Sequence, residues 1–266
     1  MDPSPILYKQ RGAVVLLTLN RPDTRNALSG EAMFAAFEQL FEQLNADATV
    51  RVAVLTGAGT SFCSGGNVAE MRDRQGMFAG TPEQIAENYR AGIQRIPRAF
   101  QTLQVPIIAA VNGAAIGAGN DLACMCDIRI ASTSARFAES FVKVGIVPGD
   151  GGCWLLPRTV GASRAAEMAF TGETIDAQEA LRIGLVSRVV ESDALLPEAL
   201  ALAARIAANP PQVLRWTKQL LQQARTGTLD EALDAAGRFQ GLAHCTAHHA
   251  EAVAAFFDKR TPVFSP

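Results

Sequence analysis

Three glycines stand close together between Val111 and Asp121, in a run that reads VNGAAIGAGND. Apolar residues 106–111 precede the glycines and predict a buried strand, and a helical turn is predicted after them. Glycine lets a ligand approach the main chain, and the first N–H groups of a helix have no partner within that helix. The run therefore predicts bare N–H donors for an oxyanion, with the Asp121 carboxylate beside them. The plainer alternative is a tight turn in which Asp121 is solvated and complements the helix dipole.

A second loop rich in glycine and serine spans residues 57–67 and reads GAGTSFCSGGN. It follows an apolar strand predicted at 50–56 and precedes a helix predicted at 68–72. Ligands in α/β folds bind beyond the carboxyl ends of strands. We therefore expect both glycine loops to face one crevice.

The elements that must position these loops alternate along the chain. The order of strand and helix predicts an α/β fold, in which strands feed helices on the face of a sheet. The second half is rich in helices, and Asp176 is a candidate N-cap. The predicted strands are 12–20, 50–56, 106–111 and 184–190. The predicted helices are 30–44, 68–72, 82–103, 122–127, 161–170, 176–183, 195–208, 211–224, 229–242 and 246–257.

Composition and charge narrow the classes of protein to which this chain can belong. The chain has 266 residues, 48% apolar and 19% charged, as expected for one large or two small globular domains. A net charge of −2 leaves no basic footprint, so we expect no nucleic acid and no membrane surface as a partner. No apolar run reaches about 18 residues, and no secretory signal pattern is recognised. Five cysteines without a C-x-x-C pair fit free thiols, and we expect a cytoplasmic protein.

The sequence does not match the motifs of several established binding and catalytic sites. The glycines from Gly113 onward follow G-x-x-x-G-x-G, unlike the dinucleotide fingerprint, and no Gly-Lys-Ser/Thr of a P-loop occurs. The only histidines, His244, His248 and His249, lie near the C-terminus, which gives poor support to a hydrolase triad. His244 and His248 are spaced to bind a metal or to lie on a solvated helix face. The chemistry therefore falls to backbone donors and carboxylates, and we expect no metal and no cofactor.

Three motifs in this order and spacing resemble the crotonase superfamily of enoyl-CoA hydratases and isomerases. They are SFCSGGN at 61–67, AVNGAAIGAGND at 110–121 and GIVPGDGG at 145–152. The resemblance implies a spiral of ββα units over residues 1–195, which carries the active site. It also implies a C-terminal helical region over 196–266 that mediates trimerisation, in a homotrimer or homohexamer, and completes the CoA site.

The resemblance also implies an acyl-CoA substrate, whose CoA enters as part of the substrate, and a role in fatty acid metabolism. In the family, two backbone N–H groups bind the thioester oxygen, and these match Gly66 and Ala118. Such donors stabilise the charge of a thioester enolate as it forms. The implied substrate- and CoA-binding residues are Arg25, Ala27, Leu28, Ser64, Gly65, Asn67, Gly117, Phe141, Phe256 and Lys259. The plainer alternatives are a surface arginine at residue 25 and a packed helix around residue 256.

The carboxylates depart from the hydratase pattern. Hydratases of the family use two glutamates as general base and acid; the first matches Asp121 and the second matches Phe141, which cannot titrate. Some isomerases place an aspartate near the third motif, which makes Asp150 the second catalytic candidate, one position out of register. Glu139 is another candidate. Their plainer alternatives are a turn residue for Asp150 and a helix-surface acid for Glu139.

Moving a double bond needs only proton removal at one carbon and return at another, so we expect an isomerase or weak hydratase. An acyl-CoA hydrolase or lyase, and a non-catalytic member that binds acyl-CoA or RNA, remain open. The acyl chain itself is not specified by the sequence. We expect the loop at 72–83, with residues near Phe141 and Trp154, to shape its pocket.

Overall fold

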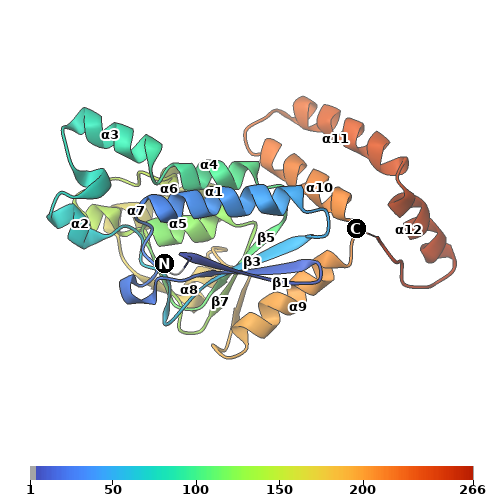
Figure 1. Ribbon diagram of the computed structural model, residues 1–266, viewed down its shortest axis with the longest axis horizontal. Helices are drawn as coiled ribbons and strands as arrows, with labels where there is room; N and C mark the ends of the chain where they lie inside the picture. The colour runs from blue at the N-terminus through green and yellow to red at the C-terminus, as the bar shows by residue number, and fades with distance from the viewer. Residues whose placement is uncertain (1–3, 266) are drawn as a thin grey trace.

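The computed structural model describes residues 4–265 and has two sheets surrounded by helices (Figure 1). The larger sheet has the strand order β1-β2-β3-β5-β7-β10, and its strands are parallel except for the β1–β2 hairpin. Its strands are β1 (Ile6–Arg11), β2 (Val14–Leu19), β3 (Val52–Gly57), β5 (Ile107–Val111), β7 (Ile128–Ser132) and β10 (Arg188–Val190). The smaller sheet has the order β4-β6-β8-β9, made of β4 (Ser61–Cys63), β6 (Ala114–Ile116), β8 (Arg136–Ala138) and β9 (Ile175–Asp176).

Helices follow the strands in a repeating order. The first half has α1 (Glu31–Ala46), α2 (Val68–Arg72), α3 (Pro82–Ala91), α4 (Arg95–Thr102), α5 (Ala118–Met125) and α6 (Gly152–Val160). The second half has α7 (Ala162–Thr171), α8 (Ala177–Arg182), α9 (Leu195–Ala207), α10 (Pro211–Gln223), α11 (Leu229–His244) and α12 (Ala247–Phe257). Short 3₁₀ helices are η1 (Pro22–Thr24), η2 (Gly76–Phe78) and η3 (Ser140–Val144).

The predicted ββα spiral is confirmed. Strands β3, β4 and helix α2 form one unit, and β5, β6 and α5 form the next, so the chain passes from the large sheet to the small one before each helix. Because β4 pairs in parallel with β6, the segments that leave these strands start from the same edge. The sequence had predicted only a loop where β4 and β6 lie, since each strand has three residues, too few to show an alternating pattern.

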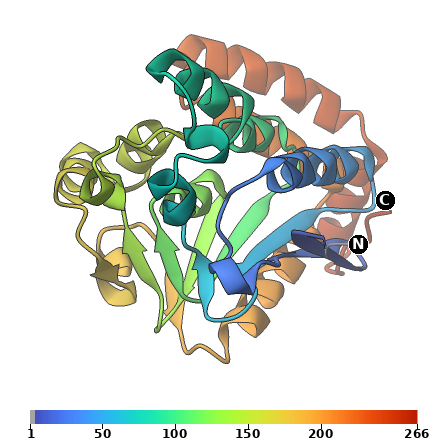
Figure 2. The same ribbon diagram turned by 60° about the vertical axis from the view of Figure 1, so that its left-hand side comes forward.

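Both faces of the large sheet are buried. Helices α1, α4 and α5 lie on one side and α9 lies on the other (Figures 1 and 2). Leu195, Ala199 and Ala203 of α9 pack with buried residues of the sheet such as Val54 and Ile108. Helix α9 thus covers the core sheet, whereas α10 to α12 extend beyond it in Figure 1. The division between 1–195 and 196–266 remains a prediction.

One helix prediction was wrong. A single helix was expected over 82–103, but α3 ends at Ala91 and α4 begins at Arg95. Gly92 between them has φ −107° and ψ −113°, outside the helical region, and a Cβ there would lie 2.7 Å from the Asn88 carbonyl oxygen. The break turns α3 away from α4 and brings it over the site described below.

Other expectations hold. The Asp176 carboxylate accepts a hydrogen bond from the Glu179 N–H at 2.8 Å and so caps α8. All five cysteines are free thiols. Within residues 4–265, no helix combines the length and the apolar character needed to cross a membrane.

Candidate active site

The two glycine loops meet directly. Gly65 lies after β4 with φ +83°, a conformation that favours glycine. A Cβ at this position would lie 2.5 Å from the Ile116 carbonyl oxygen and 3.1 Å from the Ala118 nitrogen. Only a residue without a side chain lets the first loop approach the second this closely.

Each loop presents a backbone donor. Ala118 is the first residue of α5, where a helix leaves its N–H without an internal acceptor. Gly117 before it has φ +54° and ψ −120°, which again favours glycine. Gly66 lies between β4 and α2. Within residues 4–265, no protein atom accepts a hydrogen bond from the N–H of Gly66 or Ala118, so both donors are free for a ligand.

The turn that precedes α1 lies against the first loop. The Leu28 N–H donates to the Gly65 carbonyl at 2.8 Å, and the Ser64 N–H donates to the Arg25 carbonyl at 2.9 Å. Asn26, which the sequence did not single out, is fully buried and donates to the Ser61 carbonyl at 2.9 Å. The structure therefore brings four predicted CoA-binding residues together, and whether they contact CoA remains a prediction.

Other members of that predicted set have structural partners. The Asn67 side chain caps α2 by accepting from the Ala69 N–H at 3.1 Å and donates to Glu70 at 2.8 Å. Ala27 and Leu28 are buried, so a ligand would meet their backbone rather than their side chains. Arg25 is exposed in a left-handed turn with φ +54°.

Three carboxylates are buried beneath the loops. Asp121 on α5 is 0% exposed, Glu139 before η3 is 1% exposed, and Asp150 before α6 is 3% exposed. The alternatives of a solvated Asp121 and a surface Glu139 are therefore wrong. The sequence around Glu139 gave no sign of this burial, because it arises from α6, which begins at Gly152 and packs against the Glu139 carboxylate.

Gly152 shows how closely these acids lie. A Cβ at Gly152 would stand 2.6 Å from both carboxylate oxygens of Asp121 and closer still to Oε1 of Glu139. The Asn120 amide donates to Oε2 of Glu139 at 3.0 Å. Within residues 4–265, both oxygens of Asp121, Oε1 of Glu139 and Oδ2 of Asp150 are buried without a hydrogen-bond partner outside the three acids. Unpartnered buried polar atoms are costly, so their grouping here makes the three acids candidates for a catalytic role.

The acids titrate far from their ordinary range. Burial, followed by the charges of Asp150 and Glu139, raises the pKa of Asp121 well above its usual value. Burial raises the pKa of Glu139 to about 7, although hydrogen bonds with Asn120 and Asp121 oppose the shift. Burial raises the pKa of Asp150 to about 6, opposed by a hydrogen bond with Asp121. Within residues 4–265, no salt bridge includes any of the three acids. The three acids therefore keep a proton to higher pH than separate, exposed carboxyls would, and burial with the neighbouring charges favours the protonated form of Asp121.

Phe141 lies beside the second loop. Its ring atoms would stand 3.7 Å from a Cβ at Gly117. It therefore borders the second glycine loop, and its contact with substrate remains a prediction. Phe256 and Lys259 are exposed. In Figure 1, α12 lies at the opposite end of the molecule from α2 and α3. A role for these two residues at a CoA site would have to come through a neighbouring subunit.

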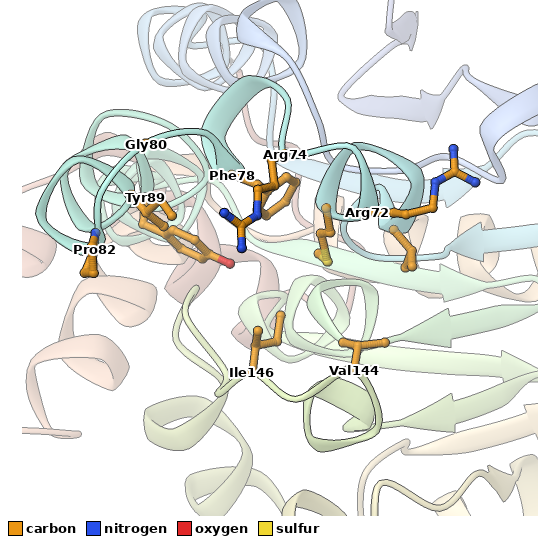
Figure 3. A pocket seen from close by; sticks show the side chains of 11 residues that line it. Arg72, Arg74, Phe78, Gly80, Pro82, Tyr89, Val144 and Ile146 are labelled. Atoms are coloured by element: carbon orange, nitrogen blue, oxygen red, sulfur yellow. The ribbon is translucent and has the colours of Figure 1, made fainter.

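A cavity of about 620 Å³ lies next to the Gly66 loop (Figure 3). Met71 in its wall would lie 2.8 Å from a Cβ at Gly66. Its lining residues come from α2, the following loop, α3 and the segment after β8; they are Val68, Met71, Arg72, Arg74, Phe78, Gly80, Pro82, Ile85, Tyr89, Val144 and Ile146. Residues of the loop at 72–83 line this cavity, and its role as the acyl pocket remains a prediction. Trp154 was expected there as well, but it lines a different cavity of about 280 Å³ with Arg225.

Two of the three histidines lie close together. His244 Nδ1 is 3.0 Å from His249 Nε2, whereas the i, i+4 spacing had suggested His248 as its neighbour in the metal-binding alternative. In the part of the chain that the structure describes, no three His, Cys, Asp or Glu side chains are grouped to hold a metal ion.

Free backbone donors above buried acids define a class: α/β enzymes that stabilise an oxyanion on the main chain and move protons with carboxylates. Comparison with known proteins identifies the family. The sequence model of enoyl-CoA hydratase/isomerase matches residues 9–266. The chain belongs to the enoyl-CoA hydratase/isomerase family, the crotonase superfamily, and is an enzyme of the hydratase/isomerase type that acts on acyl-CoA substrates.

Curated relatives include both reaction types. The chain is 38% identical to a 1,2-epoxyphenylacetyl-CoA isomerase of Escherichia coli K12, over 98% of each chain. It is 37% identical to a 2,3-dehydroadipyl-CoA hydratase of the same organism, again over 98% of each chain. The fold matches a solved enoyl-CoA hydratase of Bacillus anthracis with a TM-score of 0.89 and 34% identity, covering 98% of both chains.

Proposed function

We propose that this enzyme isomerises the double bond of an enoyl-CoA through a thioester enolate. The observation that carries this proposal is the buried cluster of Asp121, Glu139 and Asp150 beside two free backbone N–H groups. The thioester oxygen accepts hydrogen bonds from Gly66 and Ala118. Fixed donors in a water-poor site stabilise the enolate charge as it develops.

In this proposal the two aspartates take different roles, with Asp150 as the base and Asp121 as the acid. Asp150, with a pKa of about 6, is ionised at neutral pH and removes a proton from one carbon of the substrate. Asp121 holds a proton and delivers it to the other carbon when the enolate collapses. The substrate neither gains nor loses atoms. The proton then passes from Asp150 back to Asp121 within the cluster, which restores the resting state.

Glu139 acts through the aspartates rather than on the substrate. The Asn120 amide fixes its Oε2 atom, and its Oε1 atom faces the same space as Asp121. A carboxylate here keeps the neighbouring Asp121 protonated by charge repulsion. Glu139 is therefore a positioning residue in this proposal.

The acyl group enters the cavity beside Gly66, and the CoA lies along Arg25 to Leu28 and the first loop. The cavity wall at Met71 adjoins Gly66, and Tyr89 adjoins Gly149, next to Asp150. An acyl chain would therefore run from the oxyanion donors past the acids into the cavity. The relatives named above act on acyl groups as different as epoxyphenylacetyl and dehydroadipyl, so the family does not fix the acyl group.

The association into a homotrimer or homohexamer is also part of the proposal. Large apolar side chains of α11 and α12 are exposed, and contiguous apolar surface is typical of interfaces. They are Leu229, Leu233, Leu242, Val253, Phe256 and Phe257. A neighbouring subunit would then bring Phe256 and Lys259 to the CoA. We further propose a cytoplasmic enzyme of fatty acid metabolism that needs no cofactor besides the CoA of its substrate and binds no nucleic acid or membrane.

Chromatographic separation of the products followed by mass spectrometry tests the reaction, since the two enoyl-CoA isomers have the same mass. With a 3-enoyl-CoA, isomerisation leaves the mass unchanged while the double bond moves, hydration adds one water, and hydrolysis releases free CoA. We expect 3-enoyl-CoA and 2-enoyl-CoA to interconvert without a change in mass. Hydration of a 2-enoyl-CoA as the faster reaction would replace the proposal by a hydratase that holds its water between Asp121 and Asp150. Acyl-CoA binding by calorimetry without turnover would indicate a non-catalytic binder.

A further inference from the structure

The cavity beside Gly66 is mainly apolar, but arginine side chains also line it. Six of its 11 lining residues are apolar in character, namely Val68, Met71, Phe78, Ile85, Val144 and Ile146. Two arginines, Arg72 and Arg74, also line it, and no carboxylate does. The cavity is therefore apolar along its length and positive at one place.

The two arginines differ in their partners. Arg72 forms two hydrogen bonds with the Asp73 carboxylate, at 2.7 and 2.8 Å, and its side chain is 74% exposed. The guanidinium of Arg74 makes no salt bridge and no hydrogen bond with any residue among 4–265. Arg74 is therefore the cation that remains available to a ligand.

The backbone and the view in Figure 3 place the Arg74 guanidinium in the cavity. Arg74 has φ +50°, in the left-handed region that residues other than glycine rarely adopt. Figure 3 shows its guanidinium and the hydroxyl of Tyr89 pointing toward one another above Ile146, whereas Arg72 points away. Strained backbone of this kind clusters at ligand-binding sites.

Tyr89 supplies a second donor at the same place. It is half-buried, and burial, with a further contribution from the charge of Asp150, raises the pKa of its hydroxyl. The hydroxyl therefore stays protonated and can donate a hydrogen bond. A guanidinium and a phenol that converge suit a carboxylate, which accepts hydrogen bonds through two oxygens.

We infer that the enzyme selects acyl groups that end in a carboxylate, and that Arg74 with Tyr89 binds this distant carboxylate. The inference rests on the proposed placement of the acyl group in this cavity. The apolar side chains surround the methylene chain, and the two donors bind the carboxylate at its end. An acyl chain that ends in a methyl group would leave the guanidinium without a partner.

Calorimetry with saturated CoA esters tests this specificity apart from catalysis, since these esters have no double bond to move. Adipyl-CoA and hexanoyl-CoA both have six-carbon acyl groups and differ in the terminal carboxylate. We expect adipyl-CoA to bind at least roughly tenfold more tightly, as a charge-assisted hydrogen bond would give. Arg74→Met should abolish this preference while hexanoyl-CoA binds as before, and Arg74→Lys should retain part of it. Arg90→Met, which removes a charge from the exposed face of α3 outside the cavity, is the control and should keep the preference.

The outcomes separate the inference from the proposed function. If both esters bind the wild-type enzyme equally, the carboxylate specificity is wrong and the acyl-CoA site stands. If Arg74→Met weakens both esters by the same factor, Arg74 contacts the CoA and the inference is also wrong. Tighter binding of phenylacetyl-CoA than of adipyl-CoA would assign Phe78 and Tyr89 to an aromatic acyl group instead. If neither ester binds, the acyl-CoA placement fails together with the inference.

Discussion

The reaction centre and the loop at residues 72–83 are built in opposite ways. The centre consists of glycine backbone and three acids that are each at most 3% exposed. Arg74, in the loop, is exposed, and its side chain reaches the cavity from its rim. Our proposal assigns the reaction to the buried donors and acids, which the packed core holds in place. It assigns the choice of acyl group to exposed loop residues, which can change without disturbing the core.

This comparison predicts that changes in the centre abolish turnover, whereas changes in the loop alter substrate choice. The acids should give the largest effect. Asp150→Asn removes the base, and Asp121→Asn removes the acid; each should lower kcat by roughly 10²–10⁴. The wild-type rate should rise with pH through about 6 as Asp150 ionises. Full activity of both variants would contradict the acid and base roles, and Asp193→Asn, an exposed acid, is the matched control.

Loss of one backbone donor should have the next largest effect. Gly66→Pro removes the N–H and should lower kcat by about 10²–10³, the effect of one oxyanion donor. Gly66→Ala keeps the N–H, and its new methyl meets only the end of the Met71 side chain, so it serves as the control. Steady-state kinetics on folded protein, checked by circular dichroism, make the comparison. Equal rates for the two variants would show that the Gly66 donor is not used.

Gly152→Ala should disturb the centre without removing a catalytic group. Its methyl would stand against the carboxylates of Asp121 and Glu139. Overpacking of this kind costs about 1–3 kcal/mol of stability, and activity should fall because the acids are displaced. Gly237→Ala is the control, since a Cβ in that position of α11 meets nothing within 4 Å. Chemical denaturation measures the free energy of unfolding of both variants. If Gly152→Ala is as stable as Gly237→Ala, the close approach of the acids to residue 152 is contradicted.

The smallest effect concerns stability against pH. Carboxyls whose pKa is raised on folding bind protons more readily in the native state, so they stabilise the fold at low pH and this stability is lost as pH rises. For Glu139 the loss should occur between about pH 4.5 and 7. In the Glu139→Gln variant, the free energy of unfolding should therefore change less with pH across that range, by roughly 1–3 kcal/mol. Exposed Glu173→Gln should behave as the wild type, and identical pH profiles for all three proteins would argue against a buried Glu139.

The fold was largely predictable where pattern and length coincide. Helix α2 begins and ends at the predicted residues, and β5 deviates from its prediction by one residue. Strands β4 and β6 were missed because they are three residues long within glycine loops. The break at Gly92 was missed because the helical periodicity continues on both sides of it.

The site was predictable only in part. The glycines that bring the loops together are visible in the sequence, since glycine marks close backbone approach. The burial of Glu139 depends on α6, and the free guanidinium of Arg74 depends on where α3 and the segment around Ile146 meet. Such contacts join residues of different elements, and the local sequence pattern of one element does not predict them. Asn26, which anchors the turn before α1, was missed for the same reason.

A crystal structure with a bound, unreactive acyl-CoA analogue tests the central claim most directly. The thioester oxygen should lie about 2.7–3.2 Å from the nitrogens of both Gly66 and Ala118, with the acyl carbons next to Asp121 and Asp150. An oxygen bound elsewhere, or a side chain that fills the space between the two amides, would contradict the account.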